Sequence, residues 1–205
     1  MTKEVRLVGL GQDFLIHQTL ADFKQGGYVF KKADWSPYFE AGILGTRLAK
    51  LTRWNGQFRG NTVASHSILV HSMVSALTDG NPLARLLALL HDASEAYLGD
   101  IASPLKVMIP DYLGLEQTVM SLVHKYYEIP DWESSDFPEV VAAMEVLNLC
   151  DKRCSDVECF TINEDYMRLM GYLKVPQLEN DVACKYATLL DRAVRDYAGV
   201  SDDGY

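Results

Sequence analysis

The stretch LLALLHDASEAYLGDIASPLK, residues 86–106, runs from the most hydrophobic helical turn of the chain into an adjacent histidine and aspartate. Its leucines recur at helical spacing, and His91 and Asp92 extend from the end of that apolar stripe. Burying such ionisable side chains is costly unless they are paired or bind an ion. The stretch therefore predicts a core helix whose end carries ionisable side chains that need a partner or an ion.

Helical periodicity dominates the sequence from Pro37 onward, because apolar residues recur at spacings of three and four. The expected helices are 38–52, 62–79, 82–99, 111–127, 138–160 and 177–198. Alternating strand patterns are nearly absent, although Glu4–Leu7 is a candidate extended segment. The expected fold is therefore an all-α, single-domain bundle at 37–200, preceded by an N-terminal appendage at 1–36.

The composition places the chain among ordinary globular proteins. Its 205 residues are 48 % hydrophobic and 23 % charged, with a formal net charge of −9. That charge argues against binding a nucleic-acid polymer without sequence preference, which needs a basic face. No apolar run approaches the ~18 residues of a membrane span, and the N-terminal sequence has no signal-peptide core. We expect a cytoplasmic protein that does not bind membranes.

Two more of the expected helices carry an ionisable residue on their apolar face. His66 lies on the stripe of the helix at 62–79, and Asp151 lies on the stripe of the helix at 138–160. The apolar residues in register are Val70, Met73 and Leu77 for His66, and Val140, Met144, Leu147 and Cys154 for Asp151. A lone buried histidine is usually a hydrogen-bonded core residue, and a lone inward aspartate is often a cap.

Taken together, two imidazoles and two carboxylates lie on three inward helix faces: His66, His91, Asp92 and Asp151. One divalent cation would neutralise both carboxylates and use both imidazoles as neutral ligands. This donor set suits Mn, Fe, Co or Zn, and it leaves positions open for water and substrate. From the residues alone, a shared metal site and separate structural roles both remain open.

The series His66, His91-Asp92 and Asp151 resembles the H…HD…D signature of the HD-domain metal-dependent phosphohydrolases, an all-helical superfamily. A subgroup of this superfamily contains the bacterial HD-domain 5′-deoxynucleotidases, their prophage-encoded relatives and the small phage dATP triphosphohydrolases. The segments similar to that subgroup are RWNGQF (53–58), VASHSILV (63–70) and HDASEAYLGDIASPLK (91–106). The resemblance covers roughly residues 40–160 and implies an HD-type helical bundle.

The resemblance implies a metal centre with catalytic carboxylates beside it. The centre would hold one divalent transition metal per subunit (Zn, Co or Mn), with Mg added for a triphosphate substrate. Its ligands would be His66, His91, Asp92 and Asp151. Glu95 would position or deprotonate the attacking water. It lies four residues after His91, and residues at this spacing share a helix face, about 6 Å apart at Cβ. Asp100 would be a second catalytic carboxylate.

The resemblance also implies a nucleotide pocket. Arg53 and Trp54 would line the sugar and base pocket and favour a 2′-deoxyribose, and Lys106 would hold phosphate oxygens. Lys152 follows a predicted ligand directly and is a candidate contact for the further phosphates of a triphosphate. Core packing is the alternative for Trp54, and a plain helix-surface role is the alternative for Lys152.

The function implied by the resemblance is hydrolysis of deoxynucleotides. One version removes the 5′-phosphate from a deoxynucleoside monophosphate, and the other cleaves triphosphate from a deoxynucleoside triphosphate such as dATP. The alternatives are a regulatory or binding HD module that retains the metal without turnover, and a cyclic-nucleotide or alarmone hydrolase. The expected partners are a deoxynucleotide substrate and further copies of the chain in a homo-oligomer, in the host cytoplasm if a phage encodes the protein.

Overall fold

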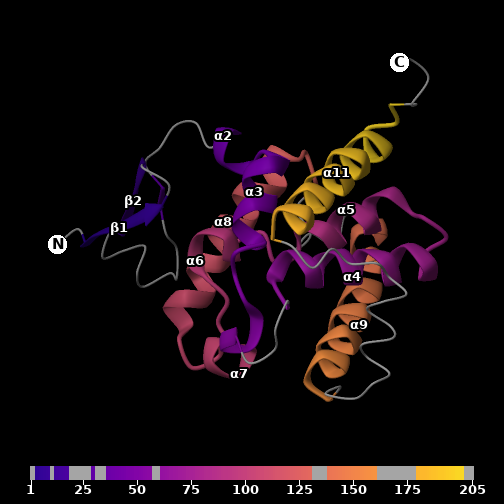
Figure 1. Cartoon of the computed structure of the whole chain (residues 1–205). Coiled ribbons are helices and arrows are strands. Elements are labelled where there is room, and N and C mark those ends of the chain that lie inside the picture. Colours follow the sequence, from indigo (N-terminus) through magenta and orange to yellow (C-terminus); the bar gives the residue numbers. More distant parts are fainter. Residues whose placement is uncertain are drawn as a thin grey trace.

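The computed structural model describes residues 3–9, 12–18, 29–30, 36–56, 61–130, 138–160 and 179–200. Within these residues, a bundle of helices follows a small antiparallel sheet, which lies to one side of the bundle in Figure 1. The strands are β1 (Lys3–Gly9), β2 (Gln12–Gln18) and β3 (Val29–Phe30). β2 is the middle strand and pairs with both of the others.

The sheet corrects the expectation that strands are nearly absent. β1 pairs with β2 from Lys3–Gln18 at one end to Gly9–Gln12 at the other, and the candidate extended segment Glu4–Leu7 lies within β1. The sequence pattern did not predict β2, because this strand carries three consecutive apolar residues, Phe14 to Ile16, in place of an alternating pattern.

The helices confirm the prediction of an all-α bundle beyond this sheet. They are α2 (Ser36–Phe39), α3 (Ala41–Leu48), the 3-10 helix η1 (Arg53–Gly56), α4 (Val63–Leu77), α5 (Pro82–Leu90), α6 (Glu95–Leu98), α7 (Ser103–Lys106), α8 (Pro110–Tyr126), α9 (Pro138–Phe160) and α11 (Glu179–Tyr197). The helix expected at 82–99 is wrong as one element, because a turn at 91–94 divides it into α5 and α6. None of the described helices is both long and apolar enough to cross a membrane.

Polar caps start the two helices that lead to the candidate site. The side-chain oxygen of Thr62 accepts a hydrogen bond from the backbone N–H of Ser65 at 3.2 Å, and Ser65 Oγ accepts one from the N–H of Thr62 at 2.9 Å. This capping box begins α4. Asn81 Oδ1 accepts from the N–H of Ala84 at 2.9 Å, and Pro82 occupies the first turn of α5. These caps fix where along the chain each helix begins.

The core lies around α4 and α5, which pack against each other and against α9 and α11, while α3 packs on α11. The leucine stripe of α5 is buried as predicted, with exposed fractions of 0–8 % at Leu83, Leu86, Leu87 and Leu90. Each fully buried leucine stabilises the fold by about 1.5–3 kcal/mol. The stripe of α4 is shorter than predicted, because Leu77 at its end is 56 % exposed.

Gly45 allows the backbone of α11 to approach α3. A Cβ at this position would lie 2.7 Å from Ala183 O and 3.3 Å from the ring of Tyr186. We expect Gly45→Ala to lower the free energy of unfolding by about 1–3 kcal/mol, because the backbone carbonyl cannot give way as a flexible side chain could.

The matched control for this substitution is Gly42→Ala, on the same helix. A Cβ there meets no described atom within 4 Å, so we expect a neutral effect or a gain of up to about 1 kcal/mol in helix propensity. Urea unfolding of both variants measures the difference. Equal effects at positions 42 and 45 would contradict the close approach of α3 and α11.

Candidate metal centre

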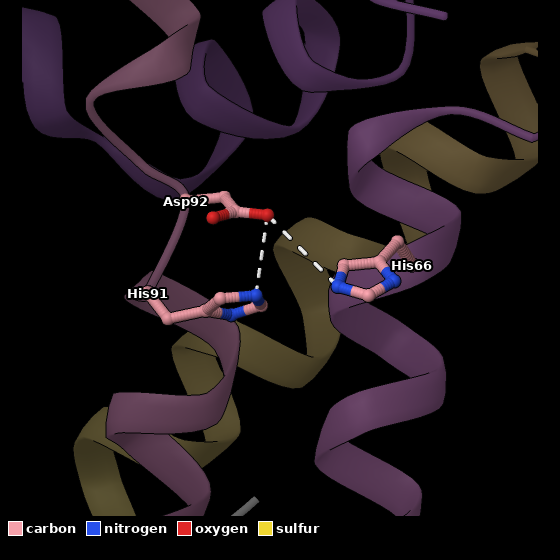
Figure 2. Close-up of side chains that lie close together, drawn as sticks. All are labelled: His66, His91 and Asp92. Carbon is pink, nitrogen blue, oxygen red and sulfur yellow. Dashed lines mark ion pairs between the residues drawn. The ribbon is translucent and has the colours of Figure 1, made fainter. Parts of the chain in front are cut away.

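The four predicted metal ligands converge from two helices and a turn. His66 lies on α4, His91 and Asp92 lie in the turn that follows α5, and Asp151 lies on α9. His66 Nε2 is 2.9 Å from Asp151 Oδ1 and 4.0 Å from Asp92 Oδ2. His91 Nε2 is 3.2 Å from Asp92 Oδ2 and 3.9 Å from Asp151 Oδ1. Figure 2 shows the first three side chains, with Asp92 pointing between the two imidazoles.

These separations suit ligands around a single ion. Bonds of about 2.0–2.2 Å to a metal place adjacent ligand atoms about 3.0 Å apart in an octahedron and about 3.5 Å apart in a tetrahedron. The candidate ligand atoms of His66, His91 and Asp92 all lie within 4.8 Å of one another. Asp151 is not part of this mutually close group, although its Oδ1 lies 2.9 Å from His66 Nε2 and 3.9 Å from His91 Nε2. Hydrogen bonds between protonated histidines and carboxylates would give similar distances, so a second observation is needed.

His91 supplies that observation. Its Nδ1 lies 2.8 Å from the carbonyl oxygen of Ala88, which can only accept, so Nδ1 carries the proton and donates. In the neutral ring Nε2 is then a bare lone pair. This buried nitrogen faces Asp92 Oδ2 at 3.2 Å and has no other hydrogen-bond partner among the described residues. The pair requires a proton or a cation between the two atoms: a protonated ring supplies the first when no ion is bound, and a divalent metal fits the second.

The electrostatics of the cluster also call for positive charge. Burial lowers the pKa of His91, but Asp92 and Asp151 outweigh this effect and raise it from 6.5 to about 9. Burial raises the pKa of Asp92, whereas His91, His66 and Arg53 together hold it well below its usual range. When no ion is bound, the cluster takes up protons instead, so a metal ion must compete with them.

Asp151 corrects one detail of the sequence prediction. The helical stripe predicted a core position for it, yet its side chain is 41 % exposed. Its neighbours on the stripe, Val140, Leu147 and Cys154, are buried as predicted. Asp151 therefore lies where the core meets a cavity.

Arg53 connects the two carboxylates that are predicted to bind a metal. Its Nη1 donates to Asp92 Oδ2 at 3.1 Å, and its Nη2 donates to Ser155 Oγ, also at 3.1 Å. Ser155 Oγ lies 3.4 Å from Asp151 Oδ1 and can donate to it. Arg53 is thus a partner of the predicted ligands as well as a lining residue, and Ser155 belongs to the same network although the sequence did not predict it. The signal was available, because Ser155 is one helical turn after Asp151.

A cavity of about 240 Å³ opens beside the ligand cluster. The predicted site residues that line it are Arg53, Trp54, Asp92, Glu95, Asp100, Lys106 and Asp151. Lys152 is exposed on α9 and is not among the described lining residues, which favours a plain surface role. A larger cavity of about 1050 Å³, between α3, the end of α8 and α11, contains none of the predicted site residues.

Glu95 is the most buried carboxylate of the cavity, with a side chain only 3 % exposed. Burial, followed by the charge of Asp92, raises its pKa to about 8, even though Lys106 acts in the opposite direction. Lys106 Nζ lies 3.0 Å from Glu95 Oε1 and 2.7 Å from Glu116 Oε1. The lysine predicted to hold phosphate oxygens is therefore engaged by two carboxylates.

The loop that carries Trp54 has an unusual backbone. Trp54 and Asn55 both adopt left-handed conformations, with φ values of 55° and 52°. Such conformations cost about 1–3 kcal/mol each in non-glycine residues and persist only where the surroundings hold them. Asp100 helps to do so, because its carboxylate accepts a hydrogen bond from the backbone of Trp54. With this backbone conformation, the half-buried indole of Trp54 lines the cavity.

The relatives found for this chain are themselves uncharacterized proteins. No family model matches the chain. An uncharacterized protein of Rhodobacter capsulatus is 40 % identical over 88 residues, which cover 40 % of this chain and 45 % of that protein. The uncharacterized protein YfdR of Escherichia coli is 32 % identical over 74 residues, or 36 % of this chain and 41 % of YfdR. The chain thus spans less than half the length of these curated relatives.

We expect metal affinity to rise with pH up to about pH 9, the pKa of His91 in the folded protein without metal. Below this pH the ring holds a proton that a metal must displace, so affinity should rise by about tenfold per pH unit for each proton released. Above it the affinity should level off.

Calorimetric titration with Mn²⁺ or Co²⁺, in two buffers of different ionisation enthalpy, measures both the affinity and the protons released. We expect about one proton per ion near neutral pH from the raised pKa of His91. Affinity that does not change with pH would contradict a site that uses this imidazole as a ligand.

Proposed function

We propose that the protein is a divalent-metal-dependent phosphohydrolase that acts on deoxynucleotides. The observation that carries this proposal is the convergence of two imidazoles and two carboxylates at the edge of a cavity that Glu95 and Asp100 also line. A purely structural metal needs neither of these additional carboxylates. The resemblance of the same residues to the HD-domain phosphohydrolases supports the same reaction class.

The metal would be held by His66, His91, Asp92 and Asp151. When bound, a divalent transition metal lowers the pKa of water and offsets the charge of phosphoryl oxygens. The proposed metal is Zn, Co or Mn, with Mg added for a triphosphate substrate.

Glu95 and Asp100 would move the protons of the reaction. As a water oxygen attacks phosphorus, its proton passes to Glu95, whose Oε2 is buried and makes no hydrogen bond to the described residues. Glu95 must be ionised to accept it, and the charge of a bound divalent ion would lower the raised pKa of this carboxyl group. The bond from phosphorus to the ester oxygen breaks, and its electron pair leaves with that oxygen. Asp100 would protonate the leaving oxygen, because burial raises the pKa of its carboxyl group. Solvent then restores both carboxyl groups.

The charge of the cavity favours a monophosphate substrate. Among the described lining residues, four carboxylates face two cations, Arg53 and Lys106. With Asp100 protonated as the proposed acid, a divalent ion brings these lining groups to a net charge of +1, which is little positive charge for the further phosphates of a triphosphate. Lys152, the expected additional cation, does not line the described cavity. We therefore favour removal of the 5′-phosphate from a deoxynucleoside monophosphate, with Arg53 and Trp54 at the sugar and base.

Metal analysis of the purified protein, followed by a nucleotide panel, tests the proposal. With Mn²⁺, Co²⁺ or Zn²⁺ present, we expect about one ion per chain and release of orthophosphate from deoxynucleoside monophosphates, with slower turnover of ribonucleotides. Release of triphosphate from dATP would reverse the substrate assignment while keeping the reaction class. Tight metal and nucleotide binding without turnover of any deoxynucleotide, cyclic nucleotide or alarmone would establish the binding module instead.

Glu95→Gln separates catalysis from metal binding. We expect the variant to retain its metal, because Glu95 is not one of the converging ligands, and to lose about 10²–10⁴-fold in kcat as the general base is removed. The matched control is Glu145→Gln at an exposed position on α9, which should leave both quantities unchanged. A Glu95→Gln protein as active as the wild type would exclude Glu95 as the base.

A further inference from the structure

Lys106 lies between two carboxylates, and the proposed reaction uses only one of them. Its Nζ donates to Glu95 Oε1 at 3.0 Å and to Glu116 Oε1 at 2.7 Å. All three groups are largely buried, with side-chain exposures of 15 % for Lys106, 3 % for Glu95 and 20 % for Glu116. Removing a second carboxylate from water costs free energy, and a buried ion pair does not necessarily offset that cost. The presence of Glu116 therefore calls for an explanation.

The contact with Lys106 gives the two carboxylate oxygens of Glu95 different surroundings. Oε1 is held by the ammonium group, whereas Oε2 is buried without a hydrogen bond to any described residue. A proton acceptor in catalysis needs one oxygen aimed at water in this way and the other held still. Lysine by itself is a poor anchor, because its charge sits at the end of a flexible four-carbon stem.

Glu116 supplies an anchor from a longer helix. Glu95 belongs to the four-residue helix α6, Lys106 to the four-residue helix α7, and Glu116 to the 17-residue helix α8. A second contact joins α8 to the end of α6, because Tyr112 Oη donates to the carbonyl oxygen of Gly99 at 2.9 Å. The longest of the three elements thus secures the two short ones that carry the proposed base and its lysine.

We propose that Glu116 is a positioning residue, which holds Lys106 in place so that Lys106 fixes Oε1 of Glu95 and leaves Oε2 to the attacking water. This inference rests on the proposed phosphohydrolase function. Lys106 then acts chiefly on the base, and its contact with substrate phosphate is secondary. The effect of Glu116 passes entirely through Lys106.

A double-mutant cycle in the full-length, metal-loaded protein tests this chain of contacts. We expect Glu116→Gln, a change of nearly equal volume, to lower kcat for deoxynucleoside monophosphates by about tenfold with KM within about twofold of the wild-type value. In a Lys106→Ala background the same change should have no further effect. Asp111→Asn, an exposed position on α8, is the control for lost charge and should match the wild type.

Three outcomes of this cycle would overturn the proposal. They are an unchanged kcat in Glu116→Gln, a change in KM alone, and effects that add in the double mutant. A wild-type protein that hydrolyses none of the nucleotides defeats the proposed function and this inference with it. An active wild type with any of the three outcomes defeats this inference alone.

Amine acylation followed by mass spectrometry tests the anchor by a readout other than turnover. In the wild type we expect Lys106 to react at least about tenfold more slowly than the exposed Lys125 at the end of α8. Glu116→Gln should speed the reaction at Lys106 and leave that at Lys125 unchanged. Equal rates at the two lysines in the wild type would show that Lys106 is not held and would overturn the proposal.

Discussion

Two carboxylates at the edge of an apolar core, Asp92 and Asp151, impose the constraint on which the rest of the site depends. Two carboxylates that face the same pair of imidazoles keep their charge only where positive charge compensates them. Two imidazoles, the guanidinium of Arg53 and a divalent ion are the groups that can provide it. Every proposed step of the chemistry follows from how this negative charge is balanced.

The turn between α5 and α6 makes the arrangement possible. In a continuous helix, neighbouring residues point about 100° apart, so His91 and Asp92 could not both face one ion. Because α5 ends at Leu90, the two side chains converge, as Figure 2 shows. The same turn brings Glu95, at the start of α6, to the cavity beside them. The end of the core helix at Leu90 is therefore the feature that brings these ionisable side chains to one cavity.

The residues around the ligands form a connected support. Arg53 bonds to Asp92 and, through Ser155, reaches Asp151, while Lys106 holds Glu95 and is itself held by Glu116. These contacts bring together η1, α6, α7, α8 and α9, which are separated along the chain. Supporting residues of this kind orient reactive groups to within fractions of an ångström, which is how a fold makes a site effective.

The periodicity of the sequence by itself determined the helical bundle, the buried leucine face of α5 and the alignment of His66 and Asp151 with core stripes, because these depend on local spacing. It did not predict the β1–β2 hairpin, whose second strand does not alternate. Only the tertiary structure decided that Ser155 and Glu116 belong to the site, that Lys106 is already paired and that Lys152 lies apart from the described cavity. Those facts depend on which helices meet and at what distance, and no repeat along the chain encodes that geometry.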